Sequence, residues 1–481
     1  MRLARRDSSV RRRAGARAVV VRLPRRILTA AVLCGLSVPL AAPAAAETLR
    51  AAVQAAVTTN PAGRAANADV QASALELLQL RGDYMPSVEL FGEVGGAYVD
   101  APNRLTPANN GQVRLSREIG VAAEYTLFDG YRRANRVYAN AAALDGAIFR
   151  LLDASETMAL NAVEAYVDVL RHRQLLGVMA ENVARHREIA RQVQDLVDSG
   201  AVPASDAFEA QERTLAARLA HVEVEKALAD ARARYKAVIG HAPSGRMSLP
   251  RVPEPPASLQ TLTVMAVKNS YQVRYAETLV QQAGFDKGVK EADLLPELGL
   301  RAGVTHNLDR AGTPGPETDA FVGLRLSWEF STGGRRATRG ALTARVREAM
   351  AERDEVVRDV QELAARAWNG YHAAVRRAQL TDQQLRASLR IRDQYRVQFE
   401  GGTRSLLDLL SAERAYYNIR FQDVSAEASL AFARFRVLAA QSRLSGFFGV
   451  DAADIPLDPG FQARAQGRPA AIFNTEIRAL E

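Results

Sequence analysis

Four short segments of the chain alternate between apolar and polar residues, and a period of two is typical of β-strands whose two faces meet different surroundings. The segments are 88–98, 119–128, 298–306 and 321–330. Every charged residue in them falls on one parity: Glu89, Glu93, Glu124, Arg301, Arg325 and Glu329. The other parity is apolar and includes Leu90, Val121, Tyr125, Leu324, Leu326 and Trp328. We therefore expect four strands, each with one charged face and one apolar face.

A soluble antiparallel sheet also has one apolar face, so alternation alone leaves two environments open. The segments are, however, about 9–11 residues long, which is the length that a tilted transmembrane strand needs. Aromatic residues also lie near their ends, as in the interfacial girdles of membrane barrels. Length and aromatic placement favour a membrane barrel, with the apolar parity facing lipid and the charged parity facing the lumen.

Four strands are too few to close a membrane barrel, because the smallest outer-membrane barrels have about eight. Open strand edges are not tolerated in lipid, so the chain must associate with further copies. Three copies would supply twelve strands under three-fold symmetry. The expected fold class is therefore mainly α with transmembrane β, as a trimer.

The chain also carries an internal repeat. The stretch YTLFDGYRR at 125–133 is echoed by WEFSTGGRR at 328–336, and Gly200 and Asp206 recur at the same offset as Gly402 and Asp408. We expect a first repeat over 47–240, a linker with five prolines over 241–258, a second repeat over 259–449, and a tail over 450–481 with no assigned role.

Helical periodicity flanks the strands in both repeats. Two uninterrupted helices are expected over 131–199 and 335–400. At about 1.5 Å per residue each would be roughly 100 Å long. Shorter helices are expected over 48–84, 200–239, 259–294 and 405–447. Within the first of these segments, Asn60-Pro61 supplies an N-cap followed by a proline at the first helical position. Helices of this length indicate a long coiled-coil assembly.

The N-terminal segment 1–46 has the pattern of a secretory signal: an Arg-rich start, a short apolar run and an Ala44-Ala45-Ala46 cleavage site. It holds ten Arg and one Asp, so its removal leaves 53 basic and 53 acidic residues. The net charge of +9 thus belongs to the signal, which removes the case for a nucleic-acid partner. Its Cys34 is the single cysteine of the chain. We expect neither disulfides nor a metal site in the mature protein.

No catalytic constellation is found in the sequence. The six histidines lack the H-E-x-x-H spacing of a zinc site, and the glycines at 92–96 lack the Lys-Ser/Thr of a phosphate loop. The sequence therefore predicts no enzyme activity and no cofactor.

Several of these motifs resemble the TolC family of outer-membrane export ducts. They include TLRAAVQAAVTTNP at 48–61, Pro86 and Pro296 before the strands, LFDGYRR at 127–133, and GTRSLLDLLSAERAYYN at 402–418. The resemblance implies a homotrimer in the outer membrane of a Gram-negative bacterium. Its twelve-stranded barrel would continue into a periplasmic barrel of α-helices and would dock on a periplasmic adaptor (membrane fusion protein) and an inner-membrane transporter.

The segment 402–418 looks like the type I secretion branch of that family. In that branch the transporter is an ABC protein and the exported substrate is a polypeptide, such as a repeat-type toxin or a protease. Two alternatives remain: a duct for small-molecule or drug efflux, and a periplasmic coiled-coil scaffold without a pore.

The resemblance also implies a gate at the periplasmic tips of the helical hairpins. Its residues would be Ser205, Asp206, Phe399, Arg404, Asp408 and Ser411. Phe399 replaces the family's tyrosine and cannot bond to Asp206 through a hydroxyl, and Ser411 replaces a second pore aspartate. The alternative is local: Ser405 and Asp408 form a capping-box pattern, Asp206 suits a helix N-terminus, and Gly200 and Gly402 are typical of helix C-termini.

Overall fold

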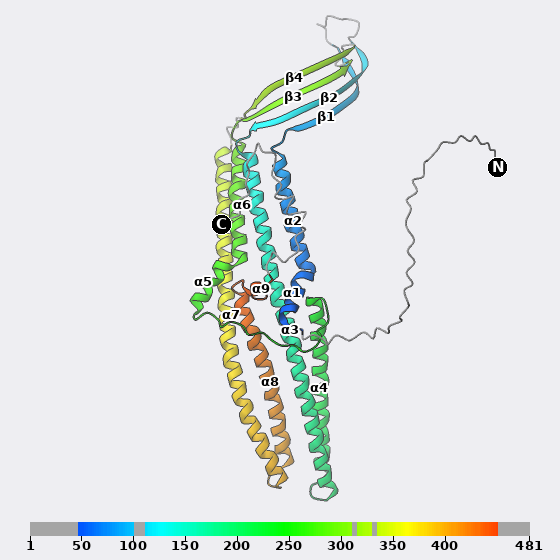
Figure 1. Ribbon diagram of the computed structural model, residues 1–481, viewed down its shortest axis with the longest axis vertical. Coiled ribbons are helices and arrows are strands. Elements are labelled where there is room, and N and C mark those ends of the chain that lie inside the picture. The colour runs from blue at the N-terminus through cyan, green and yellow to red at the C-terminus, as the bar shows by residue number, and fades with distance from the viewer. Residues whose placement is uncertain (1–46, 101–110, 310–314, 330–333, 451–481) are drawn as a thin grey trace, which may run out of the picture. The chain divides into compact units, whose positions relative to one another are not determined.

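A computed structural model describes residues 47–100, 111–309, 315–329 and 334–450 (Figure 1). The signal expected at 1–46 and the tail beyond residue 450 lie outside these ranges. The first half contains helices α1 (Leu49–Thr59) and α2 (Pro61–Gly82), strands β1 (Ser87–Val99) and β2 (Gln112–Phe128), and helices α3 (Arg132–Asp198) and α4 (Ala204–Ile239).

The second half repeats this order with nearly the same lengths. It contains α5 (Leu259–Asn269), α6 (Tyr271–Ala292), β3 (Glu297–Leu308), β4 (Pro316–Ser327), α7 (Arg335–Glu400) and α8 (Leu406–Ala439), followed by the short α9 (Leu444–Phe447). The helices have 11, 22, 67 and 36 residues in the first half and 11, 22, 66 and 34 in the second. The long helices expected from the sequence are therefore confirmed.

Local capping explains where the shorter helices begin. The Asn60 side chain accepts the backbone N–H of Ala62 at 2.9 Å, and Pro61 occupies the first position of α2, where its missing N–H is not needed. Ser270 caps α6 in the same way, by accepting the N–H of Val273 at 3.3 Å. The helix expected over 259–294 is therefore two helices, because Ser270 has an extended backbone. The helix expected over 405–447 likewise ends at Ala439.

The four strands form one antiparallel sheet in the order β1-β2-β3-β4 (Figure 1). Its register places Leu90 opposite Val121 and Val121 opposite Val304, so the apolar parity continues from strand to strand. The strands have 13, 17, 12 and 12 residues, so they are longer than the 9–11 residues expected, and several bounds differ. Strand β2 begins at Gln112 rather than at 119. Strand β4 begins at Pro316 rather than at 321 and ends at Ser327, which leaves Trp328 and Glu329 just beyond its end.

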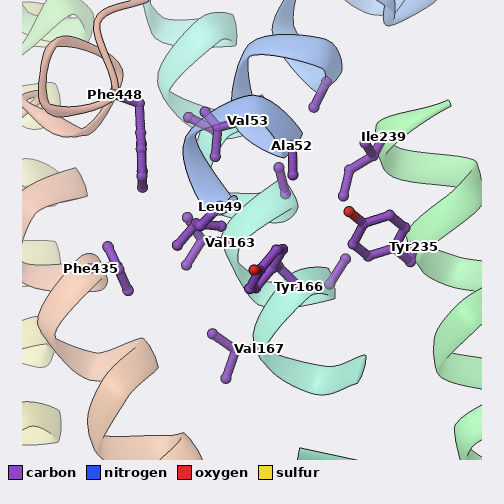
Figure 2. Close-up of a cluster of buried hydrophobic side chains, with 14 of the residues drawn as sticks. Leu49, Ala52, Val53, Val163, Tyr166, Val167, Tyr235, Ile239, Phe435 and Phe448 are labelled. Atoms are coloured by element: carbon purple, nitrogen blue, oxygen red, sulfur yellow. The ribbon is translucent and has the colours of Figure 1, made fainter. Parts of the chain in front are cut away.

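The helices pack as two hairpins that meet side by side. The helix α3 contacts α4, α6 and α8, while α7 contacts α6 and α8. The largest buried cluster lies where α1 and the middle of α3 meet the ends of α4 and α8. Figure 2 shows this cluster, with Leu49, Val53, Val163, Tyr166, Tyr235, Phe435 and Phe448 converging from these elements. No helix among the described residues is long and apolar enough to cross a membrane.

A polar cluster beside this core ties the start of the described chain to the linker between the halves. The carboxylate of Glu47 accepts hydrogen bonds from the Tyr235 hydroxyl and from the Ser244 backbone N–H, the latter at 2.7 Å. The Tyr166 hydroxyl donates to the Glu47 carbonyl at 2.7 Å and accepts the N–H of Ser248 at 3.0 Å. Burial and the Glu47 carboxylate raise the pKa of Tyr235, so its hydroxyl keeps its proton.

Candidate functional site

The apolar face of the sheet is open to its surroundings. Val322 is 77% exposed and Leu90 is 73% exposed, and the same face carries further exposed side chains: Val88, Val94, Tyr98, Val113, Leu115, Ile119, Val121, Leu300, Val304, Leu324, Leu326 and Trp328. A patch this large is unusual on a soluble monomer and marks a membrane or protein contact surface. One charge interrupts it. The N-terminal extension of β2 places Arg117 on this face, opposite Val94 and Leu308.

The charged face lies on the other side of the same sheet. Arg301 and Glu124 are direct neighbours in the register and form an ion pair, with Nε 3.9 Å from Oε2. Farther along the strands, Glu93 lies opposite Glu118. Like charges placed directly opposite each other are destabilising, and screening by water and salt reduces that cost. The structure therefore places the charged parity together on one face of the sheet, and its assignment to a lumen stays a prediction.

Two aromatic rings cover glycines on the charged face. A Cβ added to Gly120 would lie 2.5 Å from the Phe91 ring, and one added to Gly303 would lie 2.8 Å from the Phe321 ring. The two pairs occupy β1–β2 and β3–β4, one pair in each half. A Cβ at either position would displace the ring from its place over the glycine, and the rings restore the packing that glycine lacks.

The hairpin tips have the same backbone in both halves. Gly200 follows α3 with φ 78°, and Gly402 follows α7 with φ 71°. In each turn a backbone N–H reaches back around the glycine, from Ala201 to the Leu196 carbonyl at 2.8 Å and from Thr403 to the Gln398 carbonyl at 2.9 Å. This is the Schellman arrangement, which confirms the two glycines as helix C-terminal residues.

The polar residues of the second tip are held within their own hairpin. The Arg404 guanidinium lies 4.0 Å from the centre of the Tyr395 ring, its Nε donates to Gln398 Oε1 at 3.2 Å, and its Nη1 is 3.7 Å from Asp408 Oδ2. Ser405 caps α8 by accepting the Asp408 N–H at 3.2 Å, so the capping role expected for Ser405 is confirmed.

At the first tip, the Ser205 hydroxyl donates to Asp206 Oδ1 at 3.3 Å. Among the described residues, Arg404 forms no hydrogen bond or ion pair with Ser205 or Asp206. The gate role that the family resemblance implies for these residues stays a prediction. Ser411 is exposed on the first turns of α8.

An apolar cluster joins the two tips instead. Ile189, Val193 and Ala210 of the first hairpin pack with Leu406, Leu409 and Leu410 of the second. Phe399 packs against this cluster. The residue that stands in place of a gate tyrosine thus contributes apolar contact to the junction of the hairpins.

Above the tips, ion pairs link α3 to α8, and the sequence pattern did not reveal them. Arg185 Nε donates to Glu413 Oε1 at 2.9 Å, and the Glu413 side chain is 0% exposed. Arg185 Nη1 also contacts Glu188 at 2.6 Å. Burial alone would lower the pKa of Arg185, but its bonds to Glu413 and Glu188 raise that pKa overall. A second pair joins Arg420 to Glu181.

Aromatic rings extend this junction to α7. The guanidinium of Arg392 lies 4.1 Å from the centre of the Tyr416 ring, which packs edge-on against Tyr417 with 5.1 Å between the ring centres. Burial and the nearby Glu413 carboxylate raise the pKa of Tyr417 to about 12. The segment 402–418, on which the family resemblance was based, therefore contributes the contacts that hold α3, α7 and α8 together.

The described residues contain no group of histidine, cysteine or acidic side chains that could hold a metal ion. What they combine is an amphipathic four-stranded sheet and long helical hairpins joined at their tips. These features define a class of protein, the outer-membrane channels that combine strands in the membrane with helices in the periplasm.

Comparison with known proteins gives the family. The family model described as outer membrane efflux protein matches residues 52–241 and 262–441, and the chain belongs to this family. The fold agrees: the Campylobacter jejuni CmeC outer membrane channel superposes with a TM-score of 0.70 at 15% identity, covering 87% of this chain and 89% of that chain. The resemblance to the TolC family is thereby confirmed.

Two relatives are similar in sequence. The outer membrane efflux protein BepC of Brucella suis is 24% identical over 434 residues, which cover 89% of this chain and 92% of BepC. The alkaline protease secretion protein AprF of Pseudomonas aeruginosa is 26% identical over 349 residues, or 69% of each chain. The protein is thus an outer-membrane efflux channel with a periplasmic helical portion, and such channels are not enzymes.

Proposed function

We propose that the chain forms the outer-membrane channel of a type I secretion system and exports a polypeptide from the cytoplasm to the exterior. The observation that carries this proposal is the 26% identity to an alkaline protease secretion protein over 69% of both chains. The segment 402–418 supports it, because its resemblance is to the same branch and its side chains fasten the hairpins.

The functional unit would be a homotrimer. Strands β1 and β4 are the two edges of the sheet and pair on one side only within the described chain. Unpaired strand edges are costly in lipid, and pairing β4 of one copy with β1 of the next closes twelve strands. The apolar face would then contact lipid through Leu90, Val121, Tyr125, Leu324, Leu326 and Trp328. The charged face would line the lumen with Glu89, Glu93, Glu124, Arg301, Arg325 and Glu329.

The hairpin tips would form the periplasmic gate, with Ser205, Asp206, Phe399, Arg404, Asp408 and Ser411 around its opening. Three copies of Asp408 would make one ring of carboxylates, since Ser411 cannot supply a second. Arg404 bridges Tyr395 and Asp408 and would keep the tip compact.

Conductance in planar bilayers tests the gate. We expect Arg404→Ala to raise the single-channel conductance and Asp408→Ala to weaken block by divalent cations. The matched control is Arg390→Ala, an exposed arginine on α7 away from the tip. If Arg404→Ala has the conductance of the wild type, Arg404 does not hold the gate. If block by divalent cations is unchanged in Asp408→Ala, the Asp408 carboxylates do not form the blocking site.

The proposed partners are a periplasmic adaptor and an inner-membrane ABC transporter. Deletion of the gene in its host should abolish one secreted protein, and in-cell cross-linking should recover the adaptor and transporter with the channel. A second candidate, small-molecule efflux, is favoured by the efflux protein BepC, which is 24% identical over 89% of this chain. If that is the function, deletion of the gene should leave the set of secreted proteins unchanged and should lower the tolerance of the cells to toxic compounds.

A scaffold without a pore is the third alternative. It predicts a protein that stays in solution without detergent, whereas a channel needs detergent for extraction. The exposed apolar face of the sheet favours the channel.

A further inference from the structure

The first turns of α7 carry an unusual concentration of positive charge. Residues 335–347 contain five arginines and no acidic residue. Arg336, Arg339 and Arg347 lie within about 80° of one another around the axis of an ideal helix, so they share one face. All three are exposed, and none forms an ion pair with any described residue. We call these three residues the basic face of α7.

The two arginines that open α3 in the first half are neutralised within the chain. Arg132 pairs with Asp293 at 3.2 Å and with Glu297 at 3.7 Å. Arg133 pairs with Asp129 at 2.9 Å. In the sequence repeat, Arg336 corresponds to Arg133, but Thr332 stands where the first half has Asp129. At this pair of positions the second half keeps the arginine and lacks the aspartate.

The basic face lies beside the membrane-facing part of the protein. Helix α7 begins at Arg335, shortly after β4 ends at Ser327, and it starts below the sheet and next to α6 (Figure 1). The exposed Leu324 and Leu326 near the end of β4 continue to Trp328, whose amphipathic ring suits the boundary between lipid and water. The first turns of α7 thus follow directly on a lipid-compatible surface.

We propose that the basic face of α7 binds the anionic phospholipid head groups of the periplasmic leaflet of the outer membrane. Guanidinium groups form paired hydrogen bonds with phosphate oxygens, and clusters of arginine next to membrane segments attract anionic lipid. No described acidic side chain pairs with this face, so lipid phosphates take that place. This interaction would fix how deeply the sheet sits in the membrane.

The test uses the full protein reconstituted in vesicles, with Trp328 as the single tryptophan reporter after Trp368→Phe. Quenching by brominated phosphatidylglycerol and by brominated phosphatidylcholine gives the relative association of anionic and zwitterionic lipid near Trp328. We expect phosphatidylglycerol to be preferred by about fivefold or more, the factor that one basic side chain at an anionic surface supplies. The variant R336Q/R339Q/R347Q should bring the ratio close to one.

The matched control, R376Q/R377Q/R390Q, removes the same charge from exposed positions farther along α7 and should keep the preference. A ratio of one in the parent protein, or a preference that survives in R336Q/R339Q/R347Q, would overturn the proposal. Light scattering on the same variants in detergent, before reconstitution, measures their oligomeric state and gives a second outcome that would overturn the proposal. If R336Q/R339Q/R347Q loses oligomers while the control keeps them, the basic face binds a second copy of the chain.

Discussion

The buried ion pair between Arg185 and Glu413 should contribute more free energy to the stability of the junction between the hairpins than any exposed ion pair. The side chain of Glu413 is 0% exposed, and its Oε1 accepts from Arg185 at 2.9 Å while its Oε2 has no hydrogen-bond partner in the described chain. In Arg185→Ala the carboxylate would stay buried without any hydrogen bond. Breaking a buried pair from one side costs about 3–5 kcal/mol.

We take the lower end, about 3 kcal/mol, because the charge of Arg392 remains near Glu413. Glu413→Ala should cost less, since Arg185 is 15% exposed and retains Glu188 at 2.6 Å. The double variant Arg185→Leu with Glu413→Leu should be more stable than Arg185→Ala, because no charge is then left buried.

Hydrogen exchange on the purified channel measures this loss. A cost of about 3 kcal/mol for opening the start of α8 corresponds to exchange that is about a hundredfold faster for its buried amides. The control is Arg234→Ala, which breaks an equally short pair with Glu164 at 2.7 Å whose side chains are 51% and 41% exposed. Exposed pairs contribute about 1 kcal/mol or less. Exchange in Arg185→Ala within about threefold of wild type would refute the reasoning.

Three further outcomes follow from local contacts. Ser405→Ala should destabilise the first turn of α8 by about 1 kcal/mol, as hydrogen exchange would measure, and Ser405→Thr should recover most of the loss. Burial, with the charges of Arg213 and Arg185, lowers the pKa of His186, so its folded form favours the neutral ring while the unfolded chain takes up a proton near pH 6.5. The contribution of His186 to the free energy of unfolding is therefore fully present above that pH and is lost on acidification. The urea midpoints at pH 7 and pH 5 should differ less in His186→Gln than in the wild type. Glu47→Ala leaves the Tyr235 hydroxyl and the Ser244 N–H without an acceptor, so we expect the free energy of unfolding to fall by about 2 kcal/mol. Proteolysis within 241–258 should also become faster, and no change in either quantity would contradict this prediction.

The sequence predicts features that depend on near neighbours. Alternation determines which side of the sheet Leu90 and Glu89 occupy, because the strand period is two whatever the partner strand. Asn60 and Pro61 mark a helix start by their own chemistry. The same signal failed at Ser270, where the cap is not followed by a proline and the helical periodicity runs through the break.

Contacts between distant segments are beyond the reach of such patterns. Arg185 and Glu413 are separated by 228 residues, and neither belongs to a motif that requires the other. Phe399 shows a related limit. The sequence indicates which hydrogen bond the missing hydroxyl removes, but only packing reveals that the ring instead joins Leu406 and Val202 in the cluster between the tips.

The two open edges of the sheet also bear on the life of the chain before it assembles. A single copy presents unpaired strands at β1 and β4 together with a broad apolar face, a combination that promotes aggregation in water. A chain that has not yet assembled would thus be prone to aggregate in the periplasm. Rapid assembly or binding to a chaperone would keep its concentration low. For the homotrimer proposed above, the amount of channel that a cell can make would then depend on the rate at which copies find one another and the membrane.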